Sequence, residues 1–342
     1  MRTVRNKSIM QILGWSVISL CAATAGGELN VYSHRHYAID KQVNELFREK
    51  TGIEVKVVNA EADQLIERLK SEGANSPADV LIAVDVGRIQ RAKEEGLLQP
   101  LKSEALEKAT PENLRDADGQ WYSYCLRARV ILVSTERVKP GEIKDYEDLA
   151  KPEWKGRLVI RSSSSSYNQS LLASIIAANG EEKAAAWAKG VASNFARPPQ
   201  GGDRDQIKAV ASGLADVCVS NTYYFGLLQN SPDAAEREAA SKLTVVFPNQ
   251  DGRGTHVNVS AAGVTKHAKN TENAKAYLEF LVTPEVQKLI ANGSYEYPIS
   301  MDLNLCPTHA KWGEFKIDTE TFTGMGKEQV KTSKLFDAAG WK

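Results

Sequence analysis

The sequence lacks an excess of charge of either sign, because 43 lysine and arginine residues balance 43 aspartate and glutamate residues among 342. Without a basic excess to neutralise phosphates, the composition argues against a nucleic-acid-binding protein. Hydrophobic residues make up 42% and charged residues 25%, which is typical of a globular protein and not of a disordered or collagen-like chain. Because 342 residues exceed the usual size of one hydrophobic core, we expect two lobes.

Cysteine is scarce, with four residues in the chain. No CxxC pair or Cys/His spacing typical of a zinc site is present. Cys218 lies in an apolar run and is predicted to be a small buried hydrophobic residue. A disulfide bond between Cys125 and Cys306 stays open at this point, because an oxidising compartment would permit one.

Motifs that frame a hydrolytic active site are also missing, since neither G-x-S-x-G nor H-E-x-x-H occurs. A nucleophile could come from the run of five serines, Ser162 to Ser166, and a base from His256. No motif in the sequence indicates that they act together. The serines precede an expected helix, which favours a capping role for one hydroxyl over an anion site. We therefore expect a protein that is not an enzyme.

The first 25 residues have the pattern of a secretory signal peptide. Arg2, Arg5 and Lys7 form a positive region, residues 9–20 are mostly apolar, and Ala23-Thr24-Ala25 offers a small-x-small cleavage site. The apolar stretch is too short for a permanent membrane span. Residues 1–25 are expected to be removed, which predicts a periplasmic protein.

Cleavage after residue 25 removes three basic and no acidic residues, which leaves 40 basic against 43 acidic residues. The mature chain is thus expected to be slightly acidic. A lipid anchor at Cys21 is the less favoured alternative, because Leu20 stands where a lipoprotein signal has a small residue. No later stretch approaches the length of a membrane helix.

The rest of the chain alternates short apolar strands with amphipathic helices. The first helix, for example, has Ile39, Val43 and Phe47 on one face and ends at Gly52. Strands are expected at residues 29–32, 53–58, 79–84, 158–161, 215–220, 243–247 and 257–264, and further helices at 63–71, 87–94, 168–178, 181–193 and 204–212. Within 146–156 we expect a helix that Pro152 stops, followed by a turn. The repeated strand–helix–strand order predicts an α/β fold with a parallel sheet covered on both faces.

A long apolar stretch, residues 121–134, breaks this alternation. It suggests that the chain crosses between two lobes twice, near residues 125–135 and 245–260. The division expected is a first lobe of residues 26–130 plus 250–300, a second lobe of 131–249, and a C-terminal helical segment, 301–342, packed on both. Two lobes of this kind in a secreted protein predict a type II periplasmic binding protein that binds its ligand in the interlobe cleft and closes by hinge motion.

Tyrosines follow three of the expected strands. His36-Tyr37 comes after the first strand, Tyr167 after the strand at 158–161, and Tyr223-Tyr224 after the strand at 215–220. Ligands of open α/β sheets bind beyond the carboxyl ends of strands, so these side chains are candidate ligand-binding residues. A phenolate is a hard anionic donor that suits a trivalent cation such as Fe³⁺, and a bound cation can deprotonate its ligands.

Four segments strengthen this hypothesis: YSHRHYAID, SYNQSLLASIIAANG, GLADVCVSNTYYFGLL and NQDGRGTHVNVSAAGV. They resemble the periplasmic ferric-iron-binding proteins of ABC uptake systems, in particular the tyrosine-rich subgroup found in cyanobacteria and other bacteria. The resemblance covers essentially the whole chain after the leader. It implies the transferrin-like, two-crossover binding-protein fold.

The resemblance also implies a ligand set for Fe³⁺: His36 and Tyr37 from the first lobe, and Tyr167, Tyr223 and Tyr224 from the second. Another branch of the family uses a glutamate after the third strand together with phosphate or carbonate. This chain has Ala83-Val84-Asp85 there, which favours the tyrosine-rich site, although a synergistic anion such as carbonate stays open. An inner-membrane ABC permease with its ATPase is the implied partner, and the protein is expected to be a monomer.

Arg35 and Arg127 are the charged residues expected nearest to the site, where a guanidinium group would balance the excess charge of four phenolates around one Fe³⁺. The alternative for each is a surface or interlobe salt bridge.

A second function stays open, namely a binding protein of the same fold for an organic cation such as a polyamine or thiamine. The tyrosines would then be stacking walls beneath the cation. Sites of that kind usually need carboxylates at the strand ends, and few are visible here beyond Asp85.

Overall fold

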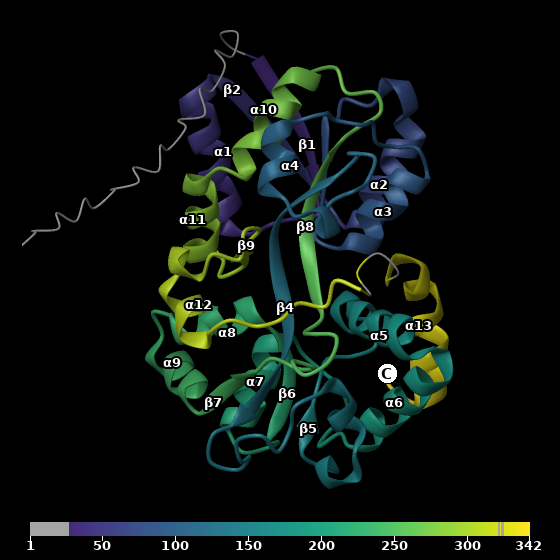
Figure 1. Ribbon diagram of the computed structural model, residues 1–342, viewed down its shortest axis with the longest axis vertical. Helices are drawn as coiled ribbons and strands as arrows, with labels where there is room; N and C mark the ends of the chain where they lie inside the picture. Colours follow the sequence, from purple (N-terminus) through teal and green to yellow (C-terminus); the bar gives the residue numbers. More distant parts are fainter. Residues whose placement is uncertain (1–26, 321, 323–324) are drawn as a thin grey trace, which may run out of the picture.

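The computed structural model describes residues 27–320, 322 and 325–342. Within them the chain folds into two α/β lobes, drawn one above the other in Figure 1, and β4 (Tyr122–Ser134) runs from one into the other. The expected signal peptide, with Cys21, lies outside the described residues. None of the described helices is long and apolar enough to cross a bilayer.

Strands and helices alternate along most of the chain. The strands are β1 (Gly27–Ser33), β2 (Ile53–Asn59), β3 (Val80–Ala83), β4, β5 (Leu158–Val159), β6 (Val217–Asn221), β7 (Leu243–Val246), β8 (Val257–Val264) and β9 (Tyr297–Pro298). The α-helices are α1 (Ala38–Thr51), α2 (Ala62–Glu72), α3 (Val86–Glu94), α4 (Glu104–Ala109), α5 (Ser166–Asn179), α6 (Glu181–Ser193), α7 (Asp203–Ala211), α8 (Thr222–Gln229), α9 (Ala234–Ser241), α10 (Thr271–Leu281), α11 (Pro284–Gly293), α12 (Pro307–Trp312) and α13 (Met325–Ala339). Short 3₁₀ helices are η1 (Gly73–Asn75), η2 (Glu112–Leu114), η3 (Tyr146–Ala150), η4 (Pro152–Trp154) and η5 (Leu303–Leu305).

The strands pair in the order β2-β1-β3-β8-β4-β6-β5, and β7 and β9 also pair with β4. Pairing is parallel between β1 and β2, between β1 and β3, and between β5 and β6. It is antiparallel between β3 and β8, β4 and β8, and β4 and β6. The prediction of a parallel sheet is therefore wrong at the crossing strands, because a chain that leaves one lobe along β4 and returns along β8 runs in opposite directions.

β4 belongs to the sheets of both lobes. Its first part, 122–128, pairs with β8, and its second part, 129–134, pairs with β6 and β7. All 13 of its residues are buried. The apolar stretch that interrupts the strand–helix alternation in the sequence is this shared strand, since a strand covered on both faces needs no polar alternation.

Most boundaries agree with the sequence within two residues, and α1 shows why. Its apolar residues Ile39, Val43 and Phe47 are buried at helical spacing. Gly52 ends the helix with φ 73°, and its N–H donates to the carbonyl of Arg48 at 2.8 Å. A left-handed residue at this position carries no steric cost for glycine.

The structure resolves two local questions. The helix expected from Tyr146 ends before Pro152 as predicted, but it is the 3₁₀ helix η3, and Pro152, which has no N–H to continue a helix, begins a second 3₁₀ helix, η4. Cys125, Cys218 and Cys306 are all buried and free, so the open Cys125–Cys306 disulfide is not formed.

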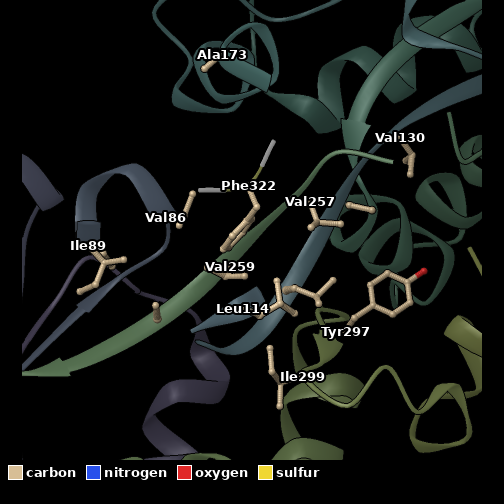
Figure 2. Close-up of a cluster of buried hydrophobic side chains, with 14 of the residues drawn as sticks. Val86, Ile89, Leu114, Val130, Ala173, Val257, Val259, Tyr297, Ile299 and Phe322 are labelled. Atoms are coloured by element: carbon tan, nitrogen blue, oxygen red, sulfur yellow. The ribbon is translucent and has the colours of Figure 1, made fainter. Parts of the chain in front are cut away.

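Three clusters of buried hydrophobic side chains stabilise the fold. One belongs to the upper lobe of Figure 1, which contains β1, β2 and β3, and one to the lower lobe, which contains β5, β6 and β7. A third cluster runs between the lobes along β4 and β8. Figure 2 shows part of the third cluster, in which the Phe322 ring lies beside Val259 and Val86. The C-terminal segment thus contributes to the core that joins the lobes.

The end of the chain packs mainly on the lower lobe. α13 contacts α5 and α6 of that lobe and also α3 of the upper lobe. The Trp341 ring, 1% exposed, makes edge contacts with Phe195 and Phe336 at centroid distances of 5.3 and 4.8 Å, and its Nε1 donates to the carbonyl of Arg161 at 3.0 Å. These contacts connect the C-terminus to the strand that precedes α5.

We expect Trp341→Ala to lower the free energy of unfolding by about 3–5 kcal/mol, because it leaves a cavity and removes a buried hydrogen bond. Val330→Ala on α13, where the side chain is 83% exposed, is the control and should change it by less than about 0.5 kcal/mol. Urea denaturation measures both. Equal losses in the two variants would contradict this account of the C-terminal anchor.

Candidate functional site

Four tyrosines from three helix N-termini gather where the two lobes meet. Tyr37 precedes α1 in the upper lobe, Tyr167 lies in the first turn of α5, and Tyr223 and Tyr224 lie in the first turn of α8. Each helix begins directly after, or a short loop after, a strand of the sheet. The strand-to-helix turns therefore place phenol rings from both lobes in one region.

The four rings are in contact across the lobe boundary. The Tyr37 ring lies edge-on to Tyr223 at 5.8 Å, and the Tyr223 and Tyr224 rings are 4.2 Å apart. The hydroxyl oxygens of Tyr167 and Tyr223 are within hydrogen-bond distance at 3.0 Å, and the Tyr167 ring is 6.5 Å from Tyr224. The structure thus brings together all four tyrosines selected from the sequence.

His36 is placed differently. Its side chain is exposed, its ring lies 5.7 Å from that of Tyr37, and its Nδ1 is 3.3 Å from the carbonyl oxygen of His34. Among the contacts of the described residues, none joins His36 to the three tyrosines of the lower lobe.

Tyr37 is positioned by an acid and a guanidinium group. The Asp40 carboxylate accepts the Tyr37 backbone N–H at 2.8 Å and the Arg35 Nε–H at 2.7 Å. The Arg35 guanidinium group lies 4.6 Å from the centroid of the Tyr37 ring. This geometry fixes the ring orientation and places a positive charge on its face.

Arg35 is already neutralised by carboxylates. It is 3% exposed and forms ion pairs with Asp40 and with Glu296, which is fully buried. Glu296 also accepts a hydrogen bond from Ser294 at 3.1 Å. Arg35 thus lies against Tyr37, near the site as expected, and is at the same time paired with two carboxylates.

Arg127 has a different environment. It is 2% exposed and donates to the carbonyl of Val84, and none of the ion pairs in the described part of the chain involves it. Burial, which lowers the pKa of a guanidinium group, is outweighed by the charges at Tyr37 and Glu296, so the pKa of Arg127 is raised. Arg127 thus carries an unpaired positive charge beside the tyrosines.

Burial raises the pKa of three of the phenols. The pKa of Tyr224 rises to about 12, with burial as the main cause and Tyr167 as the second. The pKa values of Tyr37 and Tyr223 rise further, again through burial first and neighbouring negative charge second. These tyrosines are neutral at pH 7 unless a cation replaces their protons.

Two arginines near the tyrosines were not identified from the sequence. Arg129 and Arg161 lie 5.7 and 5.0 Å from the centroid of the Tyr167 ring, and both pair with Asp203, a fully buried carboxylate. A signal existed for Arg129, because Arg127 and Arg129 stand two residues apart in an apolar strand and so share one face.

The serine run does not cap α5. Ser165 stands at the N-cap position, but its hydroxyl makes no capping hydrogen bond, so that prediction is wrong. Asn168 and Gln169 instead hold the loop by donating to the carbonyls of Arg161, Ser162 and Ser163. These hydrogen bonds hold the loop that precedes Tyr167 in place.

Carboxylates near the site are engaged in other contacts. Asp85 caps α3 by accepting the Arg88 N–H and accepts a hydrogen bond from Asn258 at 2.7 Å. Together with the pairing of Asp203 and Glu296 to arginines, this leaves few acidic groups for an organic cation. No group of three or more His, Cys, Asp or Glu side chains suited to a metal ion occurs among residues 27–320, 322 and 325–342. Any metal bound here would therefore depend on the phenol oxygens.

A two-lobe fold with a polar site at the lobe boundary defines a solute-binding protein, and comparison with known proteins agrees. Residues 75–316 match the family described as bacterial extracellular solute-binding protein. The chain belongs to this family.

Three similar proteins share the fold and the chain length. The "Iron uptake protein A1" of Synechocystis is 51% identical over 315 residues, which cover 92% of this chain and 88% of that protein. The structure of a Trichodesmium protein in complex with iron and citrate ligands superposes with a TM-score of 0.87 at 47% identity, over 92% of this chain and all of that one. The ferric binding protein from Campylobacter jejuni gives a TM-score of 0.86 at 44% identity, over 92% of this chain and all of that one.

The ion pair beneath Tyr37 yields a prediction about stability. Glu296→Gln should lower the free energy of unfolding by about 3 kcal/mol, because Arg35 is left buried with one of its two carboxylates. Glu285→Gln is the matched control, since its pair with Lys50 at 2.7 Å is exposed and should contribute at most about 1 kcal/mol. Urea denaturation at pH 7 measures both. Losses of the same size would mean that the buried pair stabilises no more than an exposed one.

Proposed function

We propose that this chain is a periplasmic solute-binding protein that captures ferric iron through tyrosinate ligands and delivers it to an inner-membrane ABC permease. The observation that carries the proposal is the contact of Tyr37 from one lobe with Tyr223 of the other, where Tyr223 also contacts Tyr167 and Tyr224. Membership of the solute-binding family and the iron-binding names of similar proteins support it.

The chemistry of the donors favours Fe³⁺. Phenolate is a hard anionic oxygen ligand, which suits a hard trivalent ion better than Cu⁺ or Zn²⁺, whose preferred ligands are sulfur and imidazole. A trivalent ion also supplies the charge needed to displace protons from phenols whose pKa values are raised.

The proposed ligands come from both lobes. Tyr167, Tyr223 and Tyr224 belong to the lower lobe and receive the ion first, and closure adds Tyr37 from the upper lobe. His36 is the candidate for a further ligand of the upper lobe, and it would have to turn from the position described above. This order of events uses the two crossing strands as the hinge.

Charge balance assigns a role to Arg127. Four phenolates around Fe³⁺ leave one net negative charge, and Arg127 is the buried guanidinium beside the tyrosines that has no carboxylate partner among the described ion pairs. Arg35, with two carboxylates of its own, orients Tyr37 rather than balancing the site.

The proposal also includes an inner-membrane permease with its ATPase as the partner, and a protein that is a monomer. Iron-loaded, closed protein would dock on the permease, and protonation of the ligands or reduction of the iron would release the ion. Binding of an organic cation is the weaker alternative, because the nearby carboxylates already pair with arginines or cap helices.

Ferric loading should produce a visible phenolate-to-iron charge-transfer band. Tyr223→Phe should reduce this band and weaken iron affinity about 100-fold or more, because it removes a ligand rather than an outer-shell partner. Tyr122→Phe is the control, since its hydroxyl donates to the carbonyl of Leu101 away from the site. A colourless ferric-loaded protein, with unchanged affinity in Tyr223→Phe, would refute the proposal.

Iron retention should decrease as the pH falls. The raised pKa values of Tyr37, Tyr223 and Tyr224 mean that protons compete with iron, and the competition grows about tenfold per pH unit for each proton displaced. The charge-transfer band, followed from pH 7.5 to 4.5, should disappear while circular dichroism still reports folded protein. A band that persists until the protein unfolds would contradict phenolate ligation.

A further inference from the structure

A small, partly open cavity lies between Tyr167 and the crossing strands. The volume open to the centre of a water-sized sphere is ≈ 10 Å³, which is room for about one water or one single-atom ion. Arg127 and Arg129 of β4, Asn221 before α8, and Ser170 of α5 contribute to its wall. His256 and Asn258, at the start of β8, and the half-buried Tyr167 of α5 complete the wall, and the lining residues other than Tyr167 are at most 6% exposed.

The wall of the cavity carries hydrogen-bond donors that are not used elsewhere. Arg127 Nη1, Arg129 Nε and Asn221 Nδ2 are buried, and no acceptor among the described residues receives a hydrogen bond from any of them. A buried N–H group without an acceptor destabilises the fold, and more so when it is charged. Three of the buried donors without an acceptor thus belong to residues that line one small cavity.

Asn221 shows that this arrangement is specific. It stands at the N-cap position of α8, where asparagine side chains usually accept a helix N–H, but it makes no such hydrogen bond. Its Oδ1 instead accepts from Arg129 Nη1 at 3.3 Å. Its Nδ2 is the third unused donor of the cavity wall.

The charge around the cavity is positive. Asp203 pairs with Arg129 at 2.7 Å and with Arg161 at 3.5 Å, so one carboxylate serves two guanidinium groups, and Arg127 has no carboxylate partner among the described ion pairs. No Asp or Glu side chain lines the cavity. His256 adds no charge, because burial lowers its pKa well below 6.5. A cation is therefore excluded by the wall of the cavity.

We propose that this cavity binds a single-atom anion, chloride in practice, through Arg127, Arg129 and Asn221. Water fits less well, because one water offers two lone pairs to three donors, whereas a halide accepts from all three. Carbonate, phosphate and citrate are too large for the volume. The cavity adjoins the tyrosines, with Tyr167 in its wall, and its small volume distinguishes it from a site for a polyatomic anion that joins a metal there.

The position of the site has a consequence for ligand binding. Its wall joins both crossing strands to α5 and α8, which carry three of the four tyrosines. It shares Arg127 with the tyrosines, so chloride and tyrosinate compete for one positive charge. This coupling, which rests on the proposed function, predicts that chloride weakens ferric binding and that iron weakens chloride binding by the same factor.

Crystals of iron-free protein soaked in bromide test the site directly. We expect an anomalous peak within hydrogen-bond distance of Arg127, Arg129 and Asn221. In solution, chloride should raise the Tm of iron-free protein by about 2–4 °C relative to gluconate at the same ionic strength. No bromide peak, or equal Tm values in the two salts, would overturn the proposal.

Two matched variants assign the effect to the cavity. Asn221→Asp places a carboxylate in the wall with little change of shape, so it should abolish the bromide peak and the chloride dependence of the Tm. Asn113→Asp makes the same change at an exposed residue of η2 and should keep both. A chloride effect that survives in Asn221→Asp would place the anion elsewhere and overturn the assignment.

Iron titrations in chloride and in gluconate test the coupling separately. Weaker ferric binding in chloride for wild type, but not for Asn221→Asp, supports it. Equal ferric affinity in the two salts overturns the coupling and leaves the anion site standing. A protein that binds bromide in the cavity but gives no charge-transfer band with iron refutes the proposed function and not the anion site.

Discussion

The structure depends on one strand that two lobes share. β4 pairs with β8 in one sheet and with β6 and β7 in the other, so the lobes cannot separate without bending it. Its residues are buried throughout, and yet Arg127 and Arg129 lie at its centre. Burying two guanidinium groups is costly unless anions compensate them. That requirement explains why carboxylates, phenols and the cavity converge at the lobe boundary.

The tyrosines and the arginines form one electrostatic system. Burial keeps the phenols protonated, whereas neighbouring acidic groups raise the pKa of Arg127 in spite of its burial, so the site is positive while the phenols keep their protons. Under the proposed function, Fe³⁺ would replace the phenol protons and convert the tyrosines into anions, whose charge Arg127 would then balance. A formal charge count, which scores tyrosine as neutral, cannot reveal such a site.

The sequence predicted more of the candidate site than of the residues around it. Tyrosines at strand-to-helix turns could be selected because the ends of strands in an α/β sheet lie together, and Tyr37, Tyr167, Tyr223 and Tyr224 are indeed in contact. Glu296 could not be selected, since it reaches Arg35 across 261 residues of sequence. The predicted serine cap of α5 is not formed. Asn168 and Gln169 instead donate to carbonyl groups of the loop before the helix, and cap preferences do not predict these hydrogen bonds.

The sequence by itself determined the α/β class, most helix and strand boundaries, and the residue types of the site, because periodicity, caps and strand ends are local properties of the chain. Tertiary structure decided the antiparallel crossing of β4 and β8, the partners of each arginine, and the free state of Cys125 and Cys306. Those outcomes depend on which distant segments share the same low-dielectric interior. In that interior a buried charge is costly unless a group of opposite charge or a hydrogen-bonding group lies beside it, and only the fold determines which group that is.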